Sequence, residues 1–190
     1  MTTGWQCPTH GVVTPYVTVP HPTAESVRQL ALQPGVPLWS SLPLPGGWTF
    51  AGAGTAVDAH TGLTRATATA FAGPSPLGGP ADLVLVAEEP GIGLGAHVAG
   101  VPDLDPGDCT SGPPDAKVAA AGHVTPLWRC QSAPDRMAFV GEALGVWLWA
   151  VLWPPEAELV LLEHVELHDL RQDAHAQLDL PLGAPSPRLP

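Results

Sequence analysis

The sequence predicts an α+β fold, mainly an antiparallel β-sheet with two or three short helices and long loops rich in proline and glycine. Two observations support this prediction. The 24 prolines and 21 glycines are spread along 190 residues, which indicates many short elements joined by turns. Hydrophobic residues make up 45% of the chain and charged residues only 13%, which is typical of a folded domain with a substantial core rather than a disordered chain.

The longest apolar run, residues 137–153, is expected to form the centre of the core. It reads MAFVGEALGVWLWAVLW and holds three of the seven tryptophans. Trp147, Trp149 and Trp153 fall on alternate positions, and apolar residues lie between them, as in a strand covered on both faces. A glutamate and two glycines interrupt the run, which is shorter than the roughly 20 apolar residues that cross a bilayer. We therefore expect a hairpin or one bent strand, with the turn or bulge at residues 142–145.

Local signals predict the remaining elements. Thr23 is a plausible N-cap for a short helix over residues 23–32, and Pro34 and Gly35 end it. Residues 158–171 fit either a helix or a strand, and we favour a short helix that passes into a strand. A proline-rich strap is expected at 37–47, and a hairpin formed by 47–57 and 63–73 follows it. A buried strand is expected at 83–86, and a glycine turn into a short helix at 91–97. An extended segment over 117–130 should bend at Gly122 and Pro126, and a helix should start at Pro154.

The charge balance excludes whole classes of partner. Seven basic residues face 18 acidic ones, and the formal net charge is −11. Affinity for nucleic acid and for anionic membranes comes from clustered lysine and arginine, so neither is an expected partner. The acidity has a simple explanation in solubility, and a basic protein partner is the alternative.

Cysteine usage and the start of the chain indicate the compartment. Cys7, Cys109 and Cys130 are too few, and odd in number, for a secreted disulfide framework. The chain does not open with a basic segment followed by an apolar one, as a signal peptide would. We therefore expect a cytoplasmic protein, while the oligomeric state is not indicated by the sequence.

Cys7 and His10 form one half of a zinc knuckle, because a tight turn holds these two ligands close together. Structural zinc sites normally have four ligands, so this half alone does not hold the metal. The site would need upstream residues, a second chain, or Cys109 or Cys130 to complete it. Without them, Cys7 and His10 lie on an ordinary loop and no cofactor is expected.

The stretch EEPGIGLGAH, residues 88–97, follows an apolar strand and superficially resembles a phosphate-binding turn. Its G-x-G-x-G spacing matches neither a dinucleotide-binding turn nor a P-loop, and no lysine follows. Two glutamates at the entrance would repel phosphate. A tight turn into a short helix is the preferred interpretation.

Two further patterns suggest metal ligands but remain incomplete. Asp103, Asp105 and Asp108 are spaced loosely like a calcium loop, yet the twelve-residue ligand pattern ending in glutamate does not occur. A solvated loop that also contains Asp115 is expected. His164 and His168 could share one helical face as a metal pair, but the sequence fixes no third ligand, so a surface position is favoured.

Seven short motifs cover nearly the whole chain: PLPGGW at 43–48, GPSPLGG at 73–79, ADLVLVAEEPGIGLGAH at 81–97, TPLW at 125–128, GEALGVWLWA at 141–150, DLR at 169–171 and SPRL at 186–189. Together they resemble an uncharacterised protein family of high-GC Gram-positive bacteria. That family has no known function, so the resemblance implies no reaction.

The resemblance also implies a zinc ribbon before the larger domain, with a first C-x-x-C knuckle and then a W-x-C-x-x-H-G stretch. Trp5, Cys7, His10 and Gly11 match the second half. The first knuckle does not occur in this sequence, either because the start codon was placed too late or because the ribbon has decayed. We expect residues 1–20 to be a remnant of this ribbon and residues 21–190 to form a single α+β domain.

No motif requires a particular chemistry, so three functional hypotheses remain. The favoured one is a non-catalytic binding or regulatory protein with an acidic surface, whose partner is a protein or a small apolar ligand. The second is a small-molecule enzyme, a hydrolase or transferase, that uses Glu88, Glu89 and His97, or His123 with Glu142, as acid and base. The third is a structural zinc protein of the ribbon type.

Overall fold

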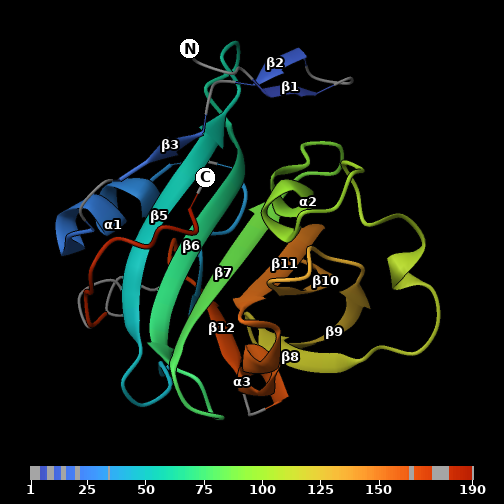
Figure 1. Cartoon of the computed structure of the whole chain (residues 1–190). Helices are drawn as coiled ribbons and strands as arrows, with labels where there is room; N and C mark the ends of the chain where they lie inside the picture. Colours follow the sequence, from blue (N-terminus) through green and yellow to red (C-terminus); the bar gives the residue numbers. More distant parts are fainter. Residues whose placement is uncertain are drawn as a thin grey trace.

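A strongly bent β-sheet forms the body of the molecule (Figure 1). In the computed structural model, the described residues are 5–7, 11–13, 16–19, 22–33, 35–162, 165–172 and 180–189. Within these ranges ten strands form one sheet, and every neighbouring pair is antiparallel except β12 with β8. The strand order is β3 (Val17–Thr18), β5 (Thr49–Val57), β6 (Thr64–Pro74), β7 (Pro80–Glu88), β11 (Val146–Trp153), β10 (Met137–Ala143), β9 (His123–Cys130), β8 (Ala116–Ala120), β12 (Glu166–Asp169) and β4 (Trp39–Ser41).

The helices are short, so the predicted α+β class is confirmed. The described α-helices are α1 (Ala24–Ala31), α2 (Leu94–Ala99) and α3 (Leu159–Leu162), and the 3₁₀ turns are η1 (Gly107–Thr110) and η2 (Pro155–Glu158). A separate pair, β1 (Trp5–Cys7) and β2 (Gly11–Val13), precedes the sheet. None of the described helices is long and apolar enough to span a bilayer.

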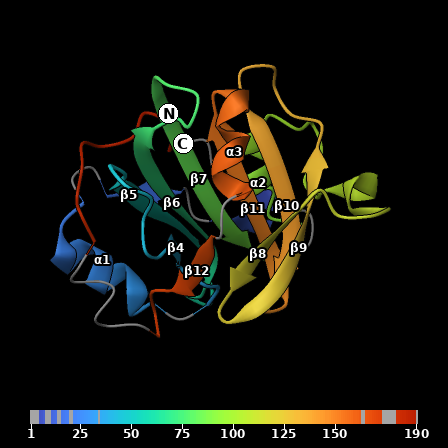
Figure 2. The same ribbon diagram turned by 90° about the horizontal axis from the view of Figure 1, so that it is seen from below.

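Strand β9 divides the sheet into two layers. Its first half, from His123 to Leu127, pairs with β8, whereas Trp128–Cys130 pair with β10. The chain therefore bends along β9, and β4 comes to lie beside β6 and β7 (Figure 2). The layers enclose one apolar core, which contains Trp39, Phe50, Phe71, Phe139 and Leu148, and a second core beneath α2 contains Val84, Val86, Trp149, Val151 and Trp153.

The central apolar run forms the predicted hairpin of β10 and β11. Its two turn residues, Leu144 and Gly145, both have positive φ, at 55° and 80°, as in the tight turns that match the twist of paired strands. Trp149 and Val151 lie in the core beneath α2, while Leu148 and Leu152 lie in the core between the layers. Both faces of β11 are therefore covered, as the alternating pattern predicted.

The first part of the predicted 37–47 strap crosses the sheet and ends as β4, and residues 35 and 36 lead into it. The hydroxyls of Thr67 and Thr69 on β6 donate hydrogen bonds to the carbonyls of Pro37 and Trp39, at 2.5 and 2.7 Å. The threonine hydroxyls thus satisfy the carbonyls of these strap residues, which are buried against β6.

The buried carboxylate of Asp169 on β12 holds the other side of the strap. It accepts a hydrogen bond from the Leu38 N–H at 3.1 Å and binds the Arg171 guanidinium, with a shortest distance of 2.6 Å. Arg171 also donates to the carbonyl of Gly35. The Asp169–Arg171 ion pair thus connects the end of β12 to the backbone of the strap at Leu38 and of Gly35 before it.

One local prediction was wrong, and two were confirmed. Residues 117–130 form two strands rather than one bent segment, because Ala121 and Gly122 both take positive φ and close a hairpin. In residues 158–171 the favoured short helix passing into a strand is found as α3 and β12. His168 lies on β12 and is partly exposed, and His164 lies outside the described residues. The predicted helix over 23–32 is confirmed as α1, with Thr23 as N-cap in a capping box.

Candidate functional site

The glycine turn before α2 is occupied by the chain's own carboxylate. Glu88 is fully buried and accepts hydrogen bonds from the backbone N–H groups of Leu94, at 2.6 Å, and Gly95, at 3.2 Å. Burial raises the pKa of Glu88 to about 8, against the lowering effect of these two bonds. The N–H of Gly91 donates to Asp105 at 2.8 Å. The groups that could have cradled a phosphate are therefore already bound.

Gly95 is required for the close contact between α2 and β11. A Cβ built at this position would lie 2.1 Å from Cδ1 of Trp149. In a helix, alanine is more stable than glycine by about 1 kcal/mol. Overpacking a core commonly costs about 1–3 kcal/mol, so the clash with Trp149 should decide whether the substitution destabilises the protein. We expect Gly95→Ala to lower the free energy of unfolding in urea by about 2 kcal/mol.

The matched control for this prediction is Gly46→Ala. A Cβ at Gly46 would meet no atom within 4 Å. Its effect should stay within about 0.5 kcal/mol of zero. A Gly95→Ala variant as stable as the wild type would show that α2 does not pack against Trp149 in this way.

The first group of predicted catalytic residues, Glu88, Glu89 and His97, does not converge on one site. Glu89 forms an ion pair with Arg65 at 2.8 Å, and Asp58 lies 3.7 Å from the same guanidinium. His97 is exposed on α2, whereas Glu88 is buried beneath the first turn of that helix. Glu88 and Glu89 thus serve as a helix anchor and an ion-pair partner.

The second group, His123 and Glu142, lies on neighbouring strands. Both side chains are exposed, on β9 and β10 respectively. Across the described parts of the chain, no hydrogen bond or ion pair joins them. Arg65 and Arg171 bind Glu89 and Asp169 rather than Glu142.

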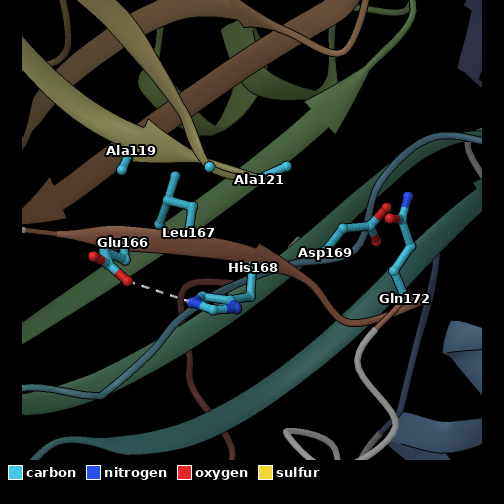
Figure 3. Close-up of a pocket in the computed structure, with 8 residues that line it drawn as sticks. Ala119, Ala121, Glu166, Leu167, His168, Asp169 and Gln172 are labelled. Atoms are coloured by element: carbon cyan, nitrogen blue, oxygen red, sulfur yellow. Dashed lines mark ion pairs between the residues drawn. The ribbon is translucent and has the colours of Figure 1, made fainter.

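A hollow of about 460 Å³ lies on the outer face of β8 and β12. Figure 3 shows Glu166 and His168 side by side on β12, with Ala119 and Ala121 opposite, and a carboxylate oxygen of Glu166 lies 3.7 Å from Nε2 of His168. The small alanine side chains leave this part of the sheet hollow. None of the five predicted catalytic residues lines it.

All six arginines of the chain are bound to carboxylates of the same chain. Each has an oxygen of a carboxylate within 4 Å of a guanidinium nitrogen. The pairs are Arg28 with Glu25, Arg65 with Glu89, Arg129 with Glu158, Arg136 with Asp135, Arg171 with Asp169 and Arg188 with Asp82. Most of the positive charge of the chain is therefore neutralised by neighbouring carboxylates.

Negative charge without such partners collects on the loop from 101 to 115. Asp103, Asp105, Asp108 and Asp115 have no ion pair within the described ranges. Asp105 instead accepts hydrogen bonds from the backbone at Gly91 and from an indole N–H, and Asp115 accepts one from the backbone N–H of residue 129 at 2.8 Å. These bonds fix the loop without cancelling its charge.

Two partly exposed tryptophans tether this loop at separate points. The indole N–H of Trp147 donates to Asp105 at 3.2 Å, and that of Trp128 donates to the carbonyl of Gly112 at 2.9 Å. Trp128 lies opposite Val140 in the ladder, and Trp147 lies opposite Glu142, so all four side chains are on one face of β9, β10 and β11.

We call residues 101–115 together with Trp128, Glu142 and Trp147 the acidic surface. The acidic surface includes an exposed apolar side chain, Leu104, which is 38% exposed. Leu144, in the hairpin turn beside Glu142, is 50% exposed. The four aspartates were visible in the sequence, but the two tryptophans reach the loop through long-range pairing that no local pattern indicates.

The predicted zinc ligands remain untested by the structure. His10 lies outside the described residues, and of Cys7 only the backbone, in β1, is described. Within the described ranges, no three His, Cys, Asp or Glu side chains are grouped to hold a metal ion.

Comparison with known proteins identifies a family for the whole chain. A family model described as a family of unknown function (DUF6758) matches residues 1–189. The chain belongs to this family. No curated protein and no solved structure matches the chain. Membership in DUF6758 assigns no reaction, so function must be argued from the acidic surface itself.

Proposed function

We propose that this protein is a non-catalytic cytoplasmic binding protein whose acidic surface binds a basic protein segment that also carries apolar side chains. The observation that carries the proposal is the distribution of charge. Every arginine is paired with a carboxylate, whereas Asp103, Asp108 and Glu142 have no basic partner in the described residues. A basic partner would neutralise these carboxylates, and their field would speed its association.

The two tryptophans supply the apolar part of the surface. Trp128 and Trp147 are partly exposed, while Trp39, Trp48, Trp149 and Trp153 are buried. Their indole nitrogens already have partners in the loop, so the rings are held in place and their free faces would need little ordering on binding. Tryptophan is enriched at protein contact surfaces, and polar and charged residues lie at their rims.

The placement of the acids and bases supports a non-catalytic role. Glu88 is bound to the backbone of α2, and Glu89 is bound to Arg65. His123 and Glu142 are both exposed and lie outside the hollow on β8 and β12. An acid and base pair acts on a substrate that a concave site holds within hydrogen-bonding reach, and these residues offer no such arrangement.

The test is the affinity of a fluorescently labelled, tryptophan-free peptide of lysine and leucine, measured by anisotropy. We expect the wild type to bind, and affinity to fall with added salt. The triple variant Asp103→Asn, Asp108→Asn, Glu142→Gln should bind about tenfold more weakly, equal to about 1.4 kcal/mol.

A charge-matched variant separates a local surface from net charge. Glu25→Gln, Glu156→Gln, Glu166→Gln removes three exposed negative charges elsewhere on the chain. It should weaken binding by less than about twofold, because screening limits distant charges to a Debye length of roughly 10 Å. Equal losses in the two triple variants, or no binding by the wild type, would reject the proposal.

A further inference from the structure

Cys109 and Cys130 lie next to each other although they come from different elements. Cys130 is the last residue of β9 and is 3% exposed, in the core beneath α2. Cys109 lies in η1, is partly exposed, and packs against the same core. Cα atoms of η1 come within 8 Å of Cα atoms of β9 and of β10. A disulfide requires Cα atoms about 4.4–6.8 Å apart, and the packing of η1 on β9 and of both cysteines against one core brings them close together.

Both cysteines are free thiols, and their surroundings differ. Burial, and then the neighbouring Cys109 thiol, raise the pKa of Cys130 well above its usual range. The Cys130 thiol therefore stays protonated and is a poor nucleophile by itself. Cys109 is the more exposed of the two, so an oxidant reaches it first.

We propose that Cys109 and Cys130 form a reversible intramolecular disulfide when the protein meets a low-molecular-weight disulfide such as oxidised glutathione. The Cys109 thiolate attacks one sulfur of the oxidant, whose S–S bond breaks and releases one glutathione thiolate. The Cys130 sulfur then attacks the sulfur of Cys109, and its proton passes to the departing glutathione thiolate, which releases the second glutathione. Two protein thiols are oxidised, and one glutathione disulfide is reduced to two thiols.

The bond would fasten the acidic loop to the sheet. It would close a ring of about 20 residues and join η1 to β9 covalently. The loop is already held at Asp105 and at Gly112 by the two tryptophans, and Cys109 lies between these points. A hollow of about 360 Å³ lined by Asp108, Cys109 and Gln131 lies at this junction. The inference does not depend on the proposed partner, because it concerns the thiols alone.

The experiment treats the folded full-length chain with oxidised glutathione, alkylates the remaining thiols with iodoacetamide, and maps the digested peptides by mass spectrometry. We expect a cross-linked peptide pair containing Cys109 and Cys130, with Cys7 alkylated, and reversal by dithiothreitol. Amide hydrogen exchange at residues 107–110 should slow by about tenfold in the oxidised protein.

Two variants keep the result interpretable. Cys7→Ser should form the same cross-link, whereas Cys109→Ser should form none and leave Cys130 reduced. Cys109→Ser is preferred to a change at buried Cys130, since the exposed site tolerates it with less risk to folding. A glutathione adduct on Cys109 that does not resolve, a disulfide between two chains, or loss of the cross-link in Cys7→Ser would each overturn the inference.

Discussion

Replacing Asp169 with alanine should lower the free energy of unfolding by about 3 kcal/mol, because it leaves the partly buried Arg171 guanidinium and the buried Leu38 N–H without their partner. The Asp169 side chain is only 2% exposed, and that of Arg171 is 21% exposed. The change also removes the acceptor for the Leu38 N–H, so the strap would lose its hold on β12. Urea unfolding should show a lower midpoint with an unchanged m-value.

The control for this prediction is Asp135→Ala. Asp135 also forms an ion pair with a neighbouring arginine, at 2.7 Å, but its side chain is 52% exposed. Exposed pairs of this kind contribute about 0–1 kcal/mol, so this variant should remain nearly as stable as the wild type. Similar losses of the free energy of unfolding from Asp135→Ala and Asp169→Ala would mean that burial does not determine how much the Asp169–Arg171 ion pair stabilises the fold.

The second large effect concerns Glu88 and the pH dependence of stability. The pKa of Glu88 is about 8 in the folded protein and has an ordinary value of 4.5. Between these values the folded chain keeps a proton that the unfolded chain releases. The stability contributed by this carboxyl group is therefore fully present below about pH 4.5 and is lost as pH rises towards 8.

Comparison with Glu88→Gln isolates this effect, because the other titrating groups are common to both proteins. The stability of the wild type relative to the variant should fall by up to about 1.4 kcal/mol per pH unit between pH 5 and 8. Urea unfolding at pH 5, 6, 7 and 8 measures this difference. A difference that stays constant or grows with pH would mean that the buried carboxyl group is ionised in the folded protein.

Elements with local signals could be predicted from the sequence. The alternation of Trp147, Trp149 and Trp153 indicated a strand covered on both faces, and the hairpin of β10 and β11 has both faces covered. Thr23 and its neighbours specified the start of α1. The β8–β9 hairpin was missed because alanine at position 121 is a weak turn signal, although it takes positive φ there.

Features that depend on distant pairing could not be predicted. Asp169 binds the backbone of Leu38, which lies 131 positions earlier. The sequence indicated a glycine turn unsuited to phosphate, but it could not show that Glu88 fills that turn itself. The four aspartates of the acidic surface were evident, whereas the pairing of each arginine with another carboxylate follows from where the arginines fold.

The position of the binding surface can be measured directly by amide hydrogen exchange with and without the lysine–leucine peptide. We expect slower exchange within residues 101–115 and 141–147 and no change at residues 119–122 and 166–172 around the hollow of β8 and β12. Protection confined to that hollow, or spread evenly over the chain, would contradict a binding function located on the acidic surface.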